Sequence, residues 1–251
     1  MASVTFRQLL PEPADVDPDT LIGALDLGQD ASEARPYTLA NFVATADGSV
    51  TFEGRSRSLG DDGDRAMFHT LREHVDGVVA GTGTLRAERY GRILGKEERR
   101  KRRIGHGRTP EPLACVITRS GDLPLDIPLF AEPEAEIVVF SPVRPPLDGV
   151  AAHVHVEHYD AAAERPLTQI MGLLRQQYGV RSLLCEGGPT LFGLLLREQL
   201  VDELFLTLAP KLAGGSTGPT MATGTPLAEL APLQIRWLLE RDASLFVRYA
   251  L

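Results

Sequence analysis

A carboxylate and two glycines interrupt an apolar stretch of the chain at residue 186. The apolar run 183–185 stops at Glu186, Gly187 and Gly188, and Pro189 then begins a second apolar segment. This order predicts a strand, a tight turn and a helix, because glycine adopts positive φ and proline suits the first helical turn. The free amides at such a helix start favour a phosphate group. Glu186 would repel phosphate, so we expect it to face another ligand; an ordinary turn with a solvated glutamate is the alternative.

Two further segments could bind anions. Residues 77–81 are apolar and bounded by glycines, as expected for a buried parallel strand, and the hydroxyl-rich segment 82–84 follows. The glycine spacing is similar to a dinucleotide-binding fingerprint, but Arg86 occupies the place of the third glycine. The segment 118–120, Thr-Arg-Ser, ends the strand predicted for residues 113–117. Its guanidinium and hydroxyls could bind the 2′-phosphate of NADP, or could belong to an ordinary surface turn.

Two other patterns have simple explanations. Residues 96–108 include seven basic residues. We expect an exposed loop there and not a nucleic-acid-binding arm, because the chain is acidic overall and no aromatic residues are interleaved. His153, His155 and Glu157 would share one face of a strand predicted at residues 151–156, a possible spacing for metal ligands. A polar strand facing solvent explains the same residues, and we predict no metal site.

The composition limits the classes of protein. The 251 residues are 43% hydrophobic, enough for one large domain, and the net charge of −8 argues against binding to nucleic acid or anionic membranes. Residues 1–19 hold no continuous apolar core, which argues against a signal peptide or a membrane span. Cys115 and Cys185 lie in separate apolar runs and predict buried thiols. We therefore expect a cytoplasmic protein without nucleic-acid or membrane partners.

The order of the elements predicts the fold. Between residues 77 and 197 apolar strands alternate with helices, which is typical of an α/β protein with a mainly parallel sheet. Residues 233–239 and 244–250 indicate an antiparallel closing pair, so the sheet is mixed. The prediction is a three-layer α/β/α fold with antiparallel C-terminal strands. We expect residues 1–35 to be an N-terminal extension packed on a single domain of residues 36–251.

Five segments carry a resemblance to a known family. They are Thr45–Gly48, Asp76–Ala87, Val116–Gly121, Glu186–Leu191 and Leu200–Pro210. In this order they resemble the pyrimidine reductases of riboflavin biosynthesis, the reductase half of bifunctional deaminase-reductases. That family shares the dihydrofolate reductase-like fold. The resemblance extends from about residue 37 to residue 251.

The resemblance implies NADPH as hydride donor and a ribosylaminopyrimidine, such as 5-amino-6-(5-phosphoribosylamino)uracil, as substrate. The implied reaction reduces the ribosylamino group to a ribitylamino group by hydride transfer to C1 of the opened sugar. On the cofactor the family resemblance places Val43, Ala44, Gly81, Thr82, Thr84, Glu88, Thr118, Arg119, Ser120, Gly187, Gly188, Pro189, Thr190 and Leu191. On the substrate it places Asn41, Ser58, Phe68 and Arg72, with Arg72 on the phosphate, and Glu186 as a catalytic carboxylate that faces the substrate.

The chain departs from the family pattern at three points. Asn41 stands where the family usually has a lysine, and Glu88-Arg89-Tyr90 stands where it usually has Asp-x-Pro. The missing lysine removes a point charge suited to a phosphate or carbonyl, so the pocket could accept another substrate. The His-x-Glu and Pro-Cys-x-x-Cys zinc motifs of the deaminase half are absent from the sequence, and we expect no deaminase activity.

Asp64 is a second candidate for a catalytic carboxylate. With Phe68 four residues later, it resembles the acidic residue at the start of the first helix of dihydrofolate reductases. It could orient and protonate a pterin or pyrimidine ring, or it could simply be a first-turn residue stabilised by the helix dipole. The alternative functions are therefore a dihydrofolate or pterin reductase and a non-catalytic nucleotide-binding relative. The family resemblance also implies a homodimer.

Overall fold

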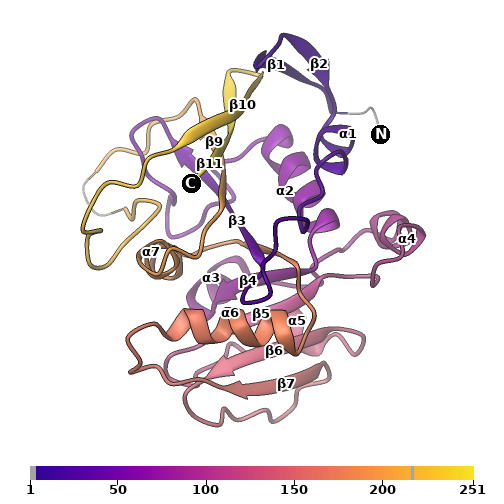
Figure 1. The fold of residues 1–251 in the computed structure, drawn as a ribbon, viewed down its shortest axis with the longest axis vertical. Helices are drawn as coiled ribbons and strands as arrows, with labels where there is room; N and C mark the ends of the chain where they lie inside the picture. The colour runs from indigo at the N-terminus through magenta and orange to yellow at the C-terminus, as the bar shows by residue number, and fades with distance from the viewer. Residues whose placement is uncertain (1–3, 216–217) are drawn as a thin grey trace.

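A mixed β-sheet forms the centre of the protein. The computed structural model describes residues 4–215 and 218–251. Seven neighbouring strands of the sheet run parallel, in the spatial order β9 (Glu203–Ala209), β3 (Tyr37–Thr45), β8 (Ser182–Cys185), β4 (Gly77–Gly81), β5 (Leu113–Ile117), β6 (Glu136–Ser141) and β7 (His153–His158). Figure 1 shows these strands crossing the molecule, with β7 at its lower edge.

The other edge of the sheet is antiparallel. β11 (Ser244–Ala250) pairs with β9, and β10 (Gln234–Arg241) pairs with β11. β1 (Phe6–Leu10) then pairs with β10, and β2 (Ala14–Val16) pairs with β1. Strands β1 and β2 therefore extend the same sheet (Figure 1).

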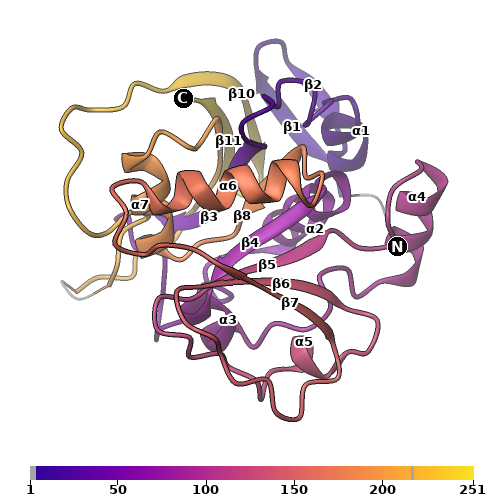
Figure 2. The same cartoon turned by 60° about the horizontal axis from the view of Figure 1, so that its bottom comes forward.

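Helices cover both faces of the sheet. One face carries α1 (Pro18–Gly23), α2 (Asp62–His74), α3 (Thr82–Glu88) and α5 (Pro128–Ala131). The opposite face carries α6 (Pro166–Gln176) and α7 (Pro189–Arg197). Figure 2 shows α6 lying across the near face, with α2 and α3 behind the sheet. The predicted three-layer α/β/α fold with a mixed, mainly parallel sheet is confirmed.

The alternation of side chains along each strand produces two separate cores. In β4, Val78 and Ala80 pack with α2, whereas Val79 packs with α6 and α7. Successive side chains of a strand point to opposite faces, and a strand buried on both faces is therefore apolar throughout. Cys115 and Cys185 are buried thiols in the second core, as expected from their apolar surroundings in the sequence.

The prediction of an exposed loop at residues 96–108 is wrong. Residues Glu97–Gly105 form helix α4, which packs against α2. Its Arg103 is only 1% exposed, and its guanidinium donates to the backbone oxygens of Glu73 (2.8 Å), Val75 (2.7 Å) and Thr109 (2.9 Å). These carbonyls include the end of α2, where helical partners run out. The basic composition of the segment predicted solvent exposure. The sequence does not reveal the buried partners of Arg103, because Glu73 and Val75 are distant from it in the chain.

The described residues were compared with the expectations that the chain has no metal site and no membrane-spanning helix. Within residues 4–215 and 218–251, no group of three or more histidine, cysteine, aspartate or glutamate side chains is arranged to hold a metal ion. His153, His155 and Glu157 lie on edge strand β7. In the same described ranges, no helix combines the length and apolar character needed to cross a membrane.

Candidate active site

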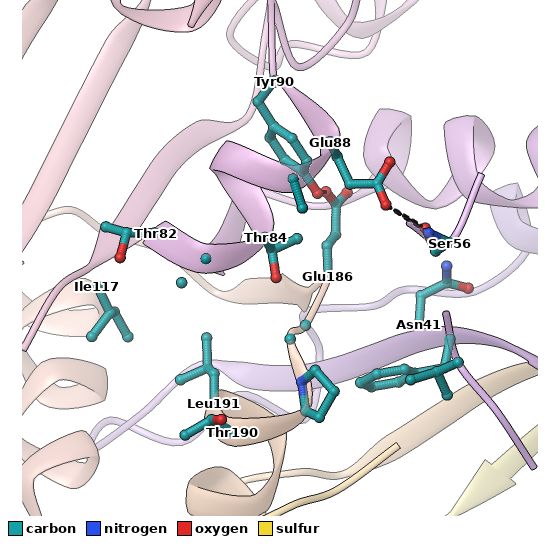
Figure 3. Close-up of a pocket in the computed structure, with 18 of the residues that line it drawn as sticks. Asn41, Ser56, Thr82, Thr84, Glu88, Tyr90, Ile117, Glu186, Thr190 and Leu191 are labelled. Atoms are coloured by element: carbon teal, nitrogen blue, oxygen red, sulfur yellow. Dashed lines mark hydrogen bonds between the residues drawn. The ribbon is translucent and has the colours of Figure 1, made fainter. Parts of the chain in front are cut away.

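A cavity of about 1060 Å³ opens at the carboxyl ends of β3, β8, β4 and β5. β3 is the first parallel strand of the chain and lies between β8 and β9, so the strand order changes direction here. Ligands of open α/β sheets bind at such switch points. In Figure 3, Thr82, Thr84, Thr190 and Leu191 lie around one part of the cavity, and Asn41, Ser56 and Glu88 lie around the other. We call these parts the α3–α7 half and the α2 half.

The glycine turn after β8 forms a wall of the α3–α7 half. Gly187 has a φ of +91°, and its oxygen accepts a hydrogen bond from the amide of Gly81 at 3.3 Å. A Cβ on Gly188 would lie 2.9 Å from Oγ1 of Thr84. Only glycine fits this close approach of the turn to α3 without a shift of the surrounding atoms.

The starts of α3 and α7 face the same half of the cavity. Thr82, Thr84, Thr190 and Leu191 line it, and no side chain among the described residues caps either helix start. Pro189 occupies the first turn of α7, as the sequence predicted. Uncapped backbone amides and the positive end of the helix dipole together favour an anionic group.

The loop after β5 lies at the far end of the α3–α7 half. Arg119 and Ser120 are exposed and line the cavity. Thr118 is buried instead, and its Oγ1 accepts a hydrogen bond from the amide of Gly121 at 3.1 Å. The hydroxyl of Tyr159 donates to the backbone oxygen of Thr118 at 3.1 Å. Thr118 therefore shapes the turn that presents Arg119 and Ser120.

One face of α2 lines the other half. Asp64, Phe68 and Arg72 are spaced four residues apart, so they lie above one another along the helix. Burial raises the pKa of Asp64, and a hydrogen bond with Thr207 offsets part of this effect. The side chain of Asp61 caps α2 by accepting from the amide of Asp64 at 2.8 Å. Asp64 is therefore a half-buried carboxyl group at the start of α2 that lines the cavity.

Arg72 and Glu186 form a buried ion pair at the base of the cavity. Nε and Nη2 of Arg72 each donate to one carboxylate oxygen of Glu186 at 2.6 Å, and the hydroxyl of Tyr90 donates to Oε2 of Glu186 at 2.6 Å. The side chains of Arg72 and Glu186 are 9% and 1% exposed. Burial opposes the charge on Arg72, but Glu186 outweighs it and raises the pKa of the guanidinium. Burial likewise raises the pKa of Tyr90, which keeps its hydroxyl a donor.

The loop between β3 and α2 is fixed to the end of α3. The amide and hydroxyl of Ser56 both donate to Oε1 of Glu88, at 2.8 and 2.9 Å (Figure 3). Glu88 lines the cavity, as does Ser56. Ser58, predicted to bind substrate, is exposed outside the cavity lining, and its backbone oxygen accepts from Lys211. Ser56 is the serine of this loop that reaches the cavity.

Most of the predicted site residues come together in this cavity. Its lining includes Asn41, Val43, Asp64, Phe68, Arg72, Gly81, Thr82, Thr84, Glu88, Arg119, Ser120, Glu186, Gly187, Gly188, Pro189, Thr190 and Leu191. Ala44, Ser58 and Thr118 are not part of the lining.

Sequence reasoning missed Tyr90, Ser56 and Tyr159, which also line the cavity. Tyr90 belongs to the Glu-Arg-Tyr segment that departs from the family pattern, and this departure was the available signal. Ser56 is two residues from the predicted Ser58. Tyr159 lies 41 residues after Thr118 in the chain. The residues around Tyr159 give no sign that it reaches the cavity.

The fold and the cavity define an α/β protein with a ligand site at the carboxyl ends of its parallel strands. The chain belongs to the RibD C-terminal domain family, whose model matches residues 36–241.

Curated relatives are similar over most of the chain. The 2,5-diamino-6-ribosylamino-4(3H)-pyrimidinone 5′-phosphate reductase of Archaeoglobus fulgidus is 29% identical over 192 residues, which is 76% of this chain and 87% of the relative. The Aquifex aeolicus protein of the same name is 24% identical over 206 residues, which is 79% of this chain and 88% of the relative.

Solved structures have the same fold. A pyrimidine reductase-like protein from Corynebacterium diphtheriae superposes with a TM-score of 0.78 at 23% identity, over 94% of this chain and 98% of the other. The riboflavin biosynthesis reductase Rib7 from Saccharomyces cerevisiae gives 0.67 at 19% identity, over 93% of this chain and 98% of the other. At these identities the likeness concerns the fold alone.

Proposed function

We propose that this protein is an NADPH-dependent reductase that converts the ribosylamino group of a pyrimidine 5′-phosphate into a ribitylamino group. The observation that carries the proposal is a single cavity with two differently built halves. Its volume of about 1060 Å³ is at the upper end of the roughly 300–1,000 Å³ typical of ligand pockets, enough for a cofactor beside a substrate. The names of the curated relatives supply the pyrimidine substrate class.

The α3–α7 half fits the cofactor. Its uncapped helix starts at Thr82 and Pro189 suit the pyrophosphate, and the absence of a Cβ at Gly188 leaves backbone accessible beside Thr84. The exposed guanidinium of Arg119 and hydroxyl of Ser120 suit the adenosine 2′-phosphate. When bound, NADPH supplies a hydride. Orientation of that donor against an electrophilic carbon is the main task of the surrounding protein.

Asp64 is the proposed proton donor of the α2 half. Opening of the ribosyl ring leaves a double bond between C1 and the amino nitrogen, and reduction adds a hydride to C1 and a proton to nitrogen. A carboxyl group with a raised pKa is suited to deliver that proton. Both oxygens of Glu186 accept hydrogen bonds from Arg72 and Tyr90, so Glu186 is suited to a positioning role.

Asn41 and Phe68 are the proposed contacts of the pyrimidine ring. Both line the α2 half, and Phe68 stacks on the guanidinium of Arg72 at 4.2 Å. An amide can both donate to and accept from the polar edge of a pyrimidine, and an aromatic ring can cover its face. Asn41 replaces the point charge of a lysine with these two hydrogen-bonding functions.

A homodimer completes the proposal. The segment between β9 and β10 and the first residues of β10 expose several large apolar side chains: Leu212, Leu227, Leu230, Leu233 and Ile235. Large apolar side chains exposed along one chain segment favour an interaction site, and most soluble homo-oligomers are symmetric dimers. We therefore propose that this segment forms the contact between two copies of the chain.

The test of function is NADPH oxidation, followed by the absorbance of the reduced nicotinamide. Purified protein is supplied with the ribosylaminopyrimidine 5′-phosphate and, in a parallel reaction, with dihydrofolate. Turnover of the pyrimidine supports the proposal. Turnover of dihydrofolate alone would reassign the protein to the pterin reductases, and failure of both substrates despite NADPH binding would favour a non-catalytic nucleotide-binding protein.

A further inference from the structure

Arg119 and Arg197 line the cavity without a protein partner. Both side chains are exposed. Neither guanidinium forms a hydrogen bond or an ion pair with any residue that the structure describes. Arg89 differs, because it is paired with Asp126 at 3.1 Å. Guanidinium donors that stay free beside a ligand cavity suit an anionic group, which they can bind through two parallel hydrogen bonds.

The segment between β7 and α6 begins beside Arg119. The hydroxyl of Tyr159 donates to the backbone oxygen of Thr118 at 3.1 Å, and Thr118 directly precedes Arg119. The amide of Asp160 donates to Oε1 of Gln169 on α6 at 3.1 Å. These contacts hold α6 close to the loop that presents Arg119.

The same helix is attached to the end of α7 through Glu198. The amides of Leu167 and Thr168, in the first turn of α6, donate to the buried carboxylate of Glu198 at 3.1 and 2.7 Å. Glu198 directly follows Arg197 in the chain. The segment between β7 and α6 therefore connects the loop of Arg119 with the end of α7, and both arginines lie at the same end of the cavity.

An apolar face of α7 leads from the helix start to Arg197. Leu191, Leu194 and Arg197 follow at intervals of three residues, and all three line the cavity. Ile117 and Leu167 add apolar lining. The axial rise between Leu191 and Arg197 is about 9 Å, and helical side chains lean toward the N-terminus, so Arg197 can reach back along this face. Such a wall suits the apolar faces of an adenine ring, next to a phosphate at the helix start.

We propose that Arg119 and Arg197 together bind the 2′-phosphate of the cofactor, and that the apolar face of α7 carries its adenine ring. The identity of the cofactor rests on the proposed function. NADH has a hydroxyl group in place of this phosphate, and a hydroxyl forms no ion pair with a guanidinium. Arg197 is therefore a residue that determines the preference for NADPH, in addition to Arg119.

Glu164 brings a negative charge to the same end of the cavity. It belongs to the segment between β7 and α6, is exposed, and forms no ion pair with a described residue. A carboxylate near the 2′-phosphate lowers its affinity by repulsion, and the two guanidiniums outweigh this single charge. Removal of the charge in Glu164→Gln should therefore tighten the binding of the phosphate.

Isothermal titration calorimetry with adenosine 2′,5′-bisphosphate tests the site without catalysis. We expect Arg197→Ala to weaken binding about 10- to 100-fold, the range of one hydrogen-bonded charge, and Arg197→Lys to retain part of the affinity. Binding of 5′-AMP, which lacks the 2′-phosphate, should be equal in Arg197→Ala and the wild type. Arg144→Ala, at an exposed arginine outside the cavity lining, is the control and should bind both nucleotides as the wild type does.

Glu164→Gln gives the opposite prediction. At low ionic strength it should bind adenosine 2′,5′-bisphosphate about two- to threefold more tightly than the wild type does. The inference would be overturned by a wild type that does not bind the bisphosphate, by equal bisphosphate affinity of Arg197→Ala and wild type, or by equal losses of both nucleotides in Arg197→Ala. Unchanged or weaker bisphosphate binding in Glu164→Gln would also overturn it.

Cofactor and substrate measurements separate this inference from the proposed function. In Arg119→Ala/Arg197→Ala the Kd of NADPH should rise to about the Kd of NADH, which should itself stay unchanged. Pyrimidine reduction by NADPH, in a protein whose Arg197→Ala variant keeps full bisphosphate affinity, would overturn the inference and leave the proposed function standing. Loss of bisphosphate affinity in Arg197→Ala, in a protein that reduces no pyrimidine, would support the site and overturn the proposed function.

Discussion

Two carboxylates in the cavity have different environments. Glu186 is held by Arg72 and Tyr90 in a buried network, whereas Asp64 lies at the start of α2 with a pKa raised by burial. Glu186 accepts three hydrogen bonds from Arg72 and Tyr90, whereas a general acid must donate a proton to the substrate. At the scale of single residues, we therefore propose Asp64 as the acid.

Asp64→Asn tests this assignment. We expect kcat to fall by a factor of about 10² to 10⁴, because the amide cannot deliver a proton. The acid is active only when protonated, so wild-type kcat should be full below the raised pKa of Asp64 and should fall as the pH rises through it. This decline should disappear from the residual activity of Asp64→Asn. The exposed Asp62→Asn, in the same helical turn, is the control and should keep the wild-type profile. An unchanged pH profile in Asp64→Asn would rule out Asp64 as the acid.

Gly187→Val tests the glycine turn. Valine at a φ of +91° is strained, and its side chain would crowd the turn toward Phe42. We expect the Kd for NADPH to rise at least about tenfold, measured by quenching of protein fluorescence. Gly95→Ala, at a position where a Cβ would meet no atom within 4 Å, is the control. Equal affinity of Gly187→Val and wild type would reject the placement of the cofactor at this turn.

The elements differ in how far they follow from local sequence. The strand, glycine turn and helix at β8 and α7 carry their signals in consecutive residues, and the structure has them as predicted. Helix α4 carries no such local signal. Its stability depends on Arg103, which donates hydrogen bonds to backbone oxygens at the end of α2, about thirty residues earlier in the chain. The amino-acid composition shows the charge of such a residue but not which buried groups it contacts.

Arg103→Met tests the role of α4. Loss of the guanidinium leaves three backbone oxygens without their donor, and we expect the free energy of unfolding to fall by about 2–4 kcal/mol in urea titrations. Lys101→Met, at a side chain 73% exposed on the same helix, should change it by at most about 0.5 kcal/mol. Similar losses in both variants would show that α4 is stabilised by its surface charges and not by Arg103.

At the scale of the whole molecule, the sequence predicts which residues carry chemistry better than it predicts their partners. The α/β order and the anion-binding turns follow from periodicity and glycine placement. The pairing of Arg72 with Glu186 joins residues 114 positions apart, one on α2 and the other directly after β8, so it depends on the tertiary fold. The family resemblance predicted Arg72 on the substrate phosphate, but the sequence did not reveal that Arg72 also pairs with Glu186.

The proposed dimer is also a property of the whole molecule. Leu230 is 97% exposed and Leu212 is 78% exposed, so charge at these positions should not disturb the fold of one chain. We expect light scattering during size-exclusion chromatography to give twice the chain mass of 27.3 kDa for the wild type and the single mass for Leu212→Asp/Leu230→Asp. Wild-type protein that elutes with the mass of one chain would reject the dimer.

Transfer of deuterium tests the central claim most directly. NADPH that carries deuterium at both C4 positions of the nicotinamide is incubated with the protein and the ribosylaminopyrimidine 5′-phosphate, and the product is analysed by mass spectrometry and NMR. We expect a ribitylaminopyrimidine that carries one deuterium at C1 of the former sugar. Unlabelled pyrimidine together with labelled tetrahydrofolate, when dihydrofolate is also present, would contradict the account and assign the cavity to a pterin.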